Sequence, residues 1–80
     1  MLRWVNSPAS KAVAKALIAA RKERGLTQRD VAARTNLAPS IIAKIEMGER
    51  RVDVLEFVAL ARALGIDELE LLAAIRSSLS

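Results

Sequence analysis

The stretch that decides the fold runs from residue 27 to residue 48 and reads TQRDVAARTNLAPSIIAKIEMG. Its first residue, Thr27, is a good helix N-cap, and Asp30 follows at the three-residue spacing of a reciprocal capping box. In such a box the side chain of each residue accepts a hydrogen bond from the backbone N–H of the other. The spacing therefore predicts a short helix over residues 28–35.

A second helix is expected after only three more residues. Pro39 suits the first position of a helix, where its missing N–H is not needed. Gly48 suits the position just after the end of a helix, where glycine is favoured. These two residues predict a helix over 39–47. So short a turn makes two helices cross at a large angle, and it requires a small residue at the crossing, a turn residue that tolerates positive φ, and apolar anchors. The residues at those places are, in that order, Ala32, Asn36, and the set Leu37, Ile42 and Ile45.

Three further helices are predicted from caps and from apolar residues at three- and four-residue steps. Their ranges are 8–24, 53–64 and 67–78, with residues 1–7 as an N-terminal arm. The apolar lines are Val13, Ala16, Leu17 and Ala20 in the first helix, and Val54, Phe57, Val58, Ala61 and Leu64 in the next. No stretch alternates polar and apolar residues, so no strand is expected. We expect one compact all-α domain of five helices over residues 1–80, with Trp4 packed at its edge.

The composition excludes several classes of function. The chain has no cysteine and no histidine, so disulfides, the usual zinc ligand sets and histidine bases are absent. No cofactor or metal is therefore expected, and we expect a protein that is not an enzyme. The apolar run over residues 12–20 is interrupted by Lys15 and is about half the roughly 20 residues that a membrane span needs. We expect a cytoplasmic protein without a membrane partner.

Charge is distributed unevenly along the chain. Residues 1–52 hold 11 Lys and Arg against 4 Asp and Glu, whereas residues 53–80 hold 2 against 5. The first part therefore has a net charge of +7 and the second a net charge of −3. A basic part of this kind indicates a polyanionic partner.

Several motifs together resemble the helix-turn-helix domains of the phage-repressor and Cro type, the XRE family. They are GLTQ at 25–28, VA at 31–32, SIIAKIEMG at 40–48 and ARALG at 61–65, and they keep the family's spacing without gaps. The resemblance extends over about residues 12–70. It implies that the helix over 39–47 enters the major groove of DNA while the helix before it crosses the phosphate backbone.

The resemblance also implies roles for individual residues. The base-contacting positions would be Ala38, Pro39, Ser40 and Lys44, and the phosphate-contacting positions would be Thr27, Gln28, Arg50 and Arg51. Arg21 and Glu46 correspond to an ion pair that orients two helices in the family. Because Ala38 and Pro39 offer no hydrogen bond to a base, we expect either modest specificity or a contribution from DNA shape.

The last helix carries more leucine than a small core is expected to need. Leu69, Leu72, Ile75 and Leu79 lie along one side of it, and we expect part of this side to form a two-fold dimer interface. The alternative is that all four residues complete the core of a single protomer.

The function expected from these features is sequence-specific binding of double-stranded DNA by a bacterial or phage transcriptional regulator. We expect a homodimer that represses by occupying a palindromic operator, with RNA polymerase or another regulator as a further potential partner. The alternative is a protein-interaction module with the same fold, such as an antitoxin-like subunit or an antagonist of another regulator.

Overall fold

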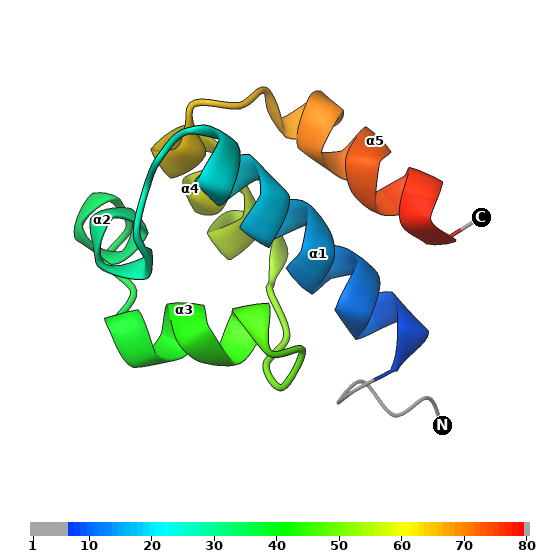
Figure 1. Cartoon of the computed structure of the whole chain (residues 1–80), viewed down its shortest axis with the longest axis horizontal. Coiled ribbons are helices and arrows are strands. Elements are labelled where there is room, and N and C mark those ends of the chain that lie inside the picture. The colour runs from blue at the N-terminus through cyan, green and yellow to red at the C-terminus, as the bar shows by residue number, and fades with distance from the viewer. Residues whose placement is uncertain (1–6, 80) are drawn as a thin grey trace.

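The computed structural model describes residues 7–79, which form five α-helices (Figure 1). The helices are α1 (Pro8–Glu23), α2 (Gln28–Arg34), α3 (Pro39–Glu46), α4 (Val54–Leu64) and α5 (Glu68–Leu79). Each helix begins and ends within one residue of its predicted range. No strand occurs between residues 7 and 79, and the all-α fold class is confirmed. Trp4 and the rest of the first six residues lie outside the described residues.

Side-chain caps set where the helices begin. The predicted capping box at α2 is present: Asp30 N–H donates to Thr27 Oγ1 over 3.0 Å, and Thr27 N–H donates to Asp30 Oδ2 over 2.8 Å. A second box, which we did not anticipate, joins Asp53 and Glu56 at the start of α4, with N–H to carboxylate distances of 2.7 and 3.0 Å. In both helices the box thus satisfies the backbone N–H groups of the N-cap residue and of the third helical residue.

The turn between α2 and α3 is closed by Thr35, a residue that we did not single out in the sequence. Thr35 is buried, and its hydroxyl donates to the carbonyl of Ala32 over 3.4 Å and accepts from the N–H of Leu37 over 3.3 Å. Arg34, one residue earlier, donates from Nη1 to the carbonyl of Ala63 over 3.0 Å. The turn is therefore bonded internally and also tied to the end of α4.

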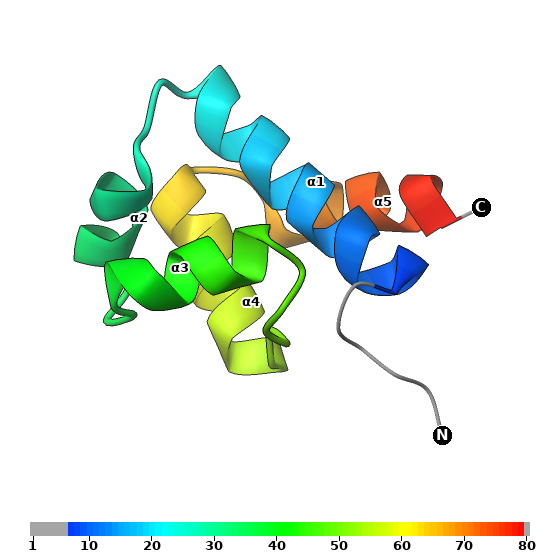
Figure 2. The ribbon, with the colours of Figure 1, turned by 60° about the horizontal axis from the view of Figure 1, so that its bottom comes forward.

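The helices pack around one core. α1 lies beside α5 on one side of the molecule, and α2 packs against α3, which crosses it (Figures 1 and 2). The largest buried side chains of this core are Leu17, Val31, Ile42, Ile45, Leu60, Leu64, Leu71 and Ile75. Since they come from all five helices, the core holds the α2–α3 pair in a fixed orientation.

Two apolar residues are placed differently from their predicted positions. Val54, expected in the buried line of α4, is 78% exposed, because it is the first residue of that helix and precedes the turns that the core covers. Ile75, expected at a dimer interface, is 7% exposed and packs in the protomer's own core together with Leu71, and it also forms part of the wall of an apolar groove beside Leu72. α5 therefore turns Leu71 and Ile75 inward and leaves Leu69, Leu72 and Leu79 exposed.

Candidate nucleic-acid interface

α3 has one buried and one exposed side. Ile42 and Ile45 are each 2% exposed and fix the helix to the core, whereas Ser40 and Lys44 are exposed. Ser40 and Lys44 are four residues apart and so lie on the same side of the helix. Ala38 and Pro39 at its start are exposed as well, and no side chain caps this end. The four predicted base-contacting residues are therefore all exposed, at the start and along one side of α3, the helix at the lower edge of the ribbon in Figure 1.

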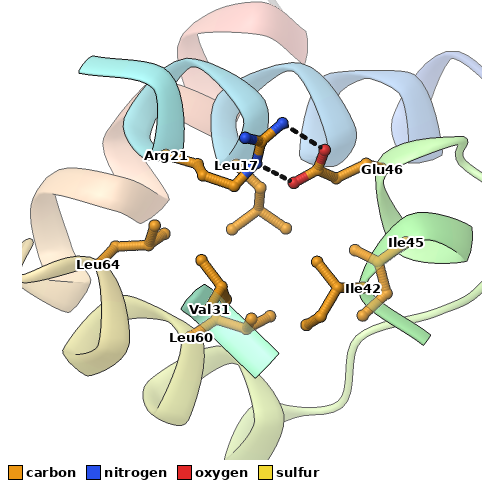
Figure 3. A pocket seen from close by; sticks show the side chains of 8 residues that line it. All are labelled: Leu17, Arg21, Val31, Ile42, Ile45, Glu46, Leu60 and Leu64. Atoms are coloured by element: carbon orange, nitrogen blue, oxygen red, sulfur yellow. Dashed lines mark hydrogen bonds and ion pairs between the residues drawn. The ribbon is translucent and has the colours of Figure 1, made fainter. Parts of the chain in front are cut away.

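The end of α3 is held to α1 by the predicted ion pair. Arg21 donates from Nε to Glu46 Oε2 over 2.7 Å and from Nη2 to Glu46 Oε1 over 3.0 Å, which is a bidentate pair (Figure 3). Its Nη1 also donates to the carbonyl of Leu26 over 2.8 Å. The two side chains are 13% and 8% exposed, and the hydrogen bond to Glu46 raises the pKa of the Arg21 guanidinium above its ordinary value. The pair therefore fixes the position of α3 at a largely buried site.

The start of α2 joins the same network. Gln28 donates from Nε2 to Glu46 Oε1 over 3.0 Å, so one carboxylate binds side chains from α1 and α2. This bond uses one of the two amide hydrogens of Gln28. Thr27 beside it is exposed, and its hydroxyl oxygen accepts the capping bond but keeps its own hydrogen to donate. Both predicted phosphate-contacting residues thus retain a donor.

Beneath the Arg21–Glu46 pair lies a small apolar void, whose lining Figure 3 shows. Its volume is about 10 Å³, which is room for roughly one water molecule. Leucine, isoleucine and valine side chains from four helices surround it. This interior space is too small for a cofactor or a substrate, and the apolar side chains that line it belong to the packed core.

The loop between α3 and α4 carries the other two predicted phosphate-contacting residues, and they differ. Arg51 is exposed, and no hydrogen bond or ion pair joins its side chain to another residue between positions 7 and 79. Arg50 instead forms a bidentate pair with Glu56, with its shortest nitrogen–oxygen distance at 2.8 Å. The structure therefore leaves the Arg51 side chain exposed and pairs the Arg50 side chain with Glu56.

Neither a metal site nor a membrane span is found in the described part of the chain. No group of three or more acidic side chains is arranged to hold a metal ion there. None of the helices between residues 7 and 79 is long and apolar enough to cross a membrane.

A helix with an outward polar surface, crossing a second helix after a four-residue turn and anchored by three others, defines a helix-turn-helix domain. The family model described as Helix-turn-helix matches residues 17–71, which include α2, α3 and α4. The chain therefore belongs to this family of transcriptional regulators, and to its phage-repressor, or XRE, type.

Similar proteins agree with that membership. An uncharacterised HTH-type transcriptional regulator of Sinorhizobium fredii (strain NBRC 101917 / NGR234), y4dJ, is 39% identical over 51 residues. The match covers 64% of this chain and 66% of that protein, slightly less than two thirds of its length. The crystal structure of the restriction-modification controller protein C.AhdI from Aeromonas hydrophila is 31% identical, covering 78% of this chain and 94% of that chain, with a TM-score of 0.74.

A further solved structure shares the fold. It is the restriction-modification controller protein C.Esp1396I, determined as a tetramer in complex with its natural 35 base-pair operator. It matches with a TM-score of 0.84 at 22% identity and covers 92% of this chain and 97% of that chain.

Proposed function

We propose that this protein is a transcriptional regulator that binds double-stranded DNA sequence-specifically through the exposed side of α3. The observation that carries the proposal is the outward position of Ser40 and Lys44 on a helix that Ile42 and Ile45 anchor to the core. Lys44 is suited to the O6 and N7 acceptors of guanine, and Ser40 can donate to or accept from several bases. Ala38 and Pro39 provide only apolar contact, for which a thymine methyl group is the natural partner.

The phosphate backbone would be bound on both sides of α3. Thr27 and Gln28 lie at the start of α2, and Arg51 lies in the loop after α3 (Figure 1). Such contacts hold a protein in register on DNA, and they contribute most of the affinity at low salt without reading sequence. The net charge of +7 in residues 1–52, which contain α1, α2 and α3, supports this arrangement.

We further propose that two copies bind as a homodimer through α5. Leu69, Leu72 and Leu79 are 74%, 51% and 54% exposed, so one helix presents three large apolar side chains to solvent. Beside them is an apolar groove of about 340 Å³ lined by Val13, Val52, Val54, Phe57, Leu72 and Ile75. In Figures 1 and 2, α5 and α3 lie on different sides of α1, so a second copy on α5 leaves α3 open to DNA.

A symmetric dimer predicts a palindromic operator. Two recognition helices about 34 Å apart match successive major grooves on one side of B-DNA. One protomer measures 34 × 24 × 21 Å, so two protomers side by side can span that separation. The operator complex of C.Esp1396I, a protein of the same fold, also supports binding by more than one copy. Repression then needs only that the dimer occupy a site that RNA polymerase requires.

The test is fluorescence anisotropy with random duplex DNA over a salt series, followed by selection of bound duplexes from a random pool. We expect binding at low salt that weakens linearly on a double logarithmic plot, with a slope of about 0.9 per phosphate contact. The selected pool should contain two inverted half-sites about one helical turn apart. A folded protein that binds no duplex at low salt would favour the protein-interaction alternative instead.

A further inference from the structure

The guanidinium of Arg50 is the centre of a network in the loop that follows α3. Its Nη1 donates to Glu56 Oε1 over 3.0 Å and its Nη2 donates to Glu56 Oε2 over 2.8 Å. The same Nη1 donates to the backbone carbonyl of Arg51 over 2.9 Å. One side chain thus joins the first turn of α4 to the peptide unit of the next residue.

Glu56, the partner of Arg50, is itself fixed by the backbone. Its Oε1 accepts from the N–H of Asp53 over 3.0 Å, and its own N–H donates to Asp53 Oδ1 over 2.7 Å. The hydrogen bond from Arg50, followed by the one from Asp53, lowers the pKa of the Glu56 carboxyl group. Glu56 therefore stays charged at neutral pH, and Arg50 is held against a helix end that does not move independently.

The other end of the loop is fixed as well. Gly48, with φ of +75°, ends α3, and the N–H groups of Gly48 and Glu49 donate to the carbonyls of Ile45 and Lys44 over 3.0 and 2.9 Å. The backbone between Glu49 and Asp53 is therefore tied down at both ends, and the contact from Arg50 holds its middle.

We propose that Arg50 is a positioning residue for DNA binding: with Glu56 it fixes the peptide unit of Arg51, so that the exposed Arg51 side chain meets a phosphate. This inference rests on the proposed function and replaces the direct phosphate contact expected of Arg50. Pre-ordering the loop lowers the entropy lost when Arg51 binds DNA.

A double-mutant cycle separates positioning from direct contact. Arg51→Ala should weaken binding to random duplex DNA several-fold and flatten the salt slope by about 0.9, the value for one phosphate contact. If Arg50 acts only through Arg51, then adding Arg50→Ala to Arg51→Ala should leave the salt slope unchanged and lower the affinity only by the small amount that loss of one nearby positive charge causes. A second loss of about 0.9 in the slope of the double variant would show that Arg50 binds a phosphate itself and would overturn the inference.

Glu56→Gln should change the affinity for DNA in opposite directions, depending on whether Arg50 positions Arg51 or whether only long-range charge matters. It removes a negative charge beside the proposed interface, so long-range electrostatics alone would tighten DNA binding. Loss of the bidentate pair should instead weaken binding, and Arg50→Lys, which keeps the charge, should do the same. The matched control is Arg62→Lys, which alters the exposed pair of Arg62 with Glu68 and should leave DNA affinity unchanged. Tighter binding by Glu56→Gln would overturn the inference.

A measurement without DNA distinguishes failure of the inference from failure of the proposed function. In the free protein, Arg50→Lys should speed amide hydrogen exchange at Asp53, whose N–H donates to Glu56, and leave exchange in the core helices unchanged. Unchanged exchange at Asp53 would overturn the role of Arg50 whether or not the protein binds DNA. Absence of DNA binding by the unmodified chain, with faster exchange in Arg50→Lys, would refute the proposed function and leave the loop-ordering role standing.

Discussion

At the scale of single residues, the carboxylate of Glu46 connects three helices. Its two oxygens accept three hydrogen bonds, two from Arg21 on α1 and one from Gln28 on α2, while the residue itself ends α3. Its side chain is 8% exposed, so water can replace a lost partner only poorly. One largely buried carboxylate thus contributes, with the apolar core, to the relative placement of α2 and α3.

Arg21→Met should therefore be strongly destabilising. Breaking a buried ion pair leaves an uncompensated charge, and we expect the free energy of unfolding to fall by about 3–5 kcal/mol. Urea unfolding followed by circular dichroism measures this loss. The matched control is Arg62→Met, because the side chain of Arg62 is 78% exposed and its pair with Glu68 should contribute less than about 1 kcal/mol. The variant Arg21→Met with Glu46→Leu should recover part of the loss, and equal effects of Arg21→Met and Arg62→Met would contradict the assignment.

Lys44 and Arg51 should affect DNA binding in different ways. Lys44→Ala should relax the preference at one base pair of the operator by about 1–3 kcal/mol and leave the salt slope nearly unchanged. Arg51→Ala should weaken binding to every sequence alike, because a phosphate contact carries no sequence information. Competition between the selected operator and singly substituted duplexes measures the first effect. If Lys44→Ala reduced the affinity for all duplexes equally, base contact by Lys44 would be excluded.

At the scale of helices, the ends of α1 and α3 allow a controlled comparison. Gly25 and Gly48 follow these helices with φ of +67° and +75°, so an alanine at either place should cost about 1–2 kcal/mol in backbone strain. A Cβ at Gly48 would also lie 3.2 Å from the Oγ of buried Ser10, whereas a Cβ at Gly25 meets nothing within 4 Å. Gly48→Ala should therefore lower the free energy of unfolding by about 1 kcal/mol more than Gly25→Ala. Adding Ser10→Ala should remove much of that difference, and equal losses at the two glycines would show that the contact is harmless.

The start of α4 should make stability depend on pH. The pKa of Glu56 is lowered in the folded protein, first by Arg50 and then by the N–H of Asp53. Above its ordinary pKa of about 4.5, the Glu56 carboxylate therefore makes its full contribution to the free energy of unfolding. That contribution is lost as the pH falls from this value through the lowered pKa of the folded protein. Urea unfolding of the unmodified chain and of Glu56→Gln should differ by about 1 kcal/mol at pH 7, and the difference should shrink towards pH 3. A difference that does not depend on pH would assign the effect to packing.

The helices themselves could be predicted because local signals agree with one another. Thr27 and Asp30 set the start of α2, and Pro39 and Gly48 set the bounds of α3, without reference to the rest of the chain. The burial of α5 could not be predicted in the same way. Helical spacing shows which residues share a side, but only the packing of α5 against α1 selects Leu71 and Ile75 as the inward residues.

The site was predictable only in part for a related reason. The proposed roles of Ser40 and Lys44 follow from their place on α3, and both side chains are exposed. Arg50 and Arg51 are adjacent and chemically identical, so the sequence does not distinguish them. Glu56 selects Arg50 as its partner, and that pairing depends on how the loop folds back on α4.

At the scale of the whole molecule, the two proposed surfaces are separated in space and in charge. Residues 1–52, with a net charge of +7, supply α1, α2 and α3, while residues 53–80, with a net charge of −3, supply α4 and α5. The apolar residues exposed on α5 lie on the other side of α1 from α3 (Figure 1). The acidic part would be a poor surface for DNA, and its exposed leucines are suited to a second copy.

Leu72→Glu should therefore separate the proposed dimer into protomers. Leu72 is exposed and also lines the apolar groove beside α5, so a carboxylate there would be buried without a partner in the dimer. Light scattering after gel filtration should give twice 8.7 kDa for the unmodified chain and 8.7 kDa for the variant. The matched control is Leu55→Glu, since Leu55 is 81% exposed on α4 but does not line that groove, and the mass of this variant should equal that of the unmodified chain.

The separated variant should bind a single half-site as the unmodified chain does and lose the added affinity for two half-sites spaced by one helical turn. A folded Leu72→Glu variant with the dimer mass would place the interface elsewhere, and monomeric unmodified chain would refute the homodimer.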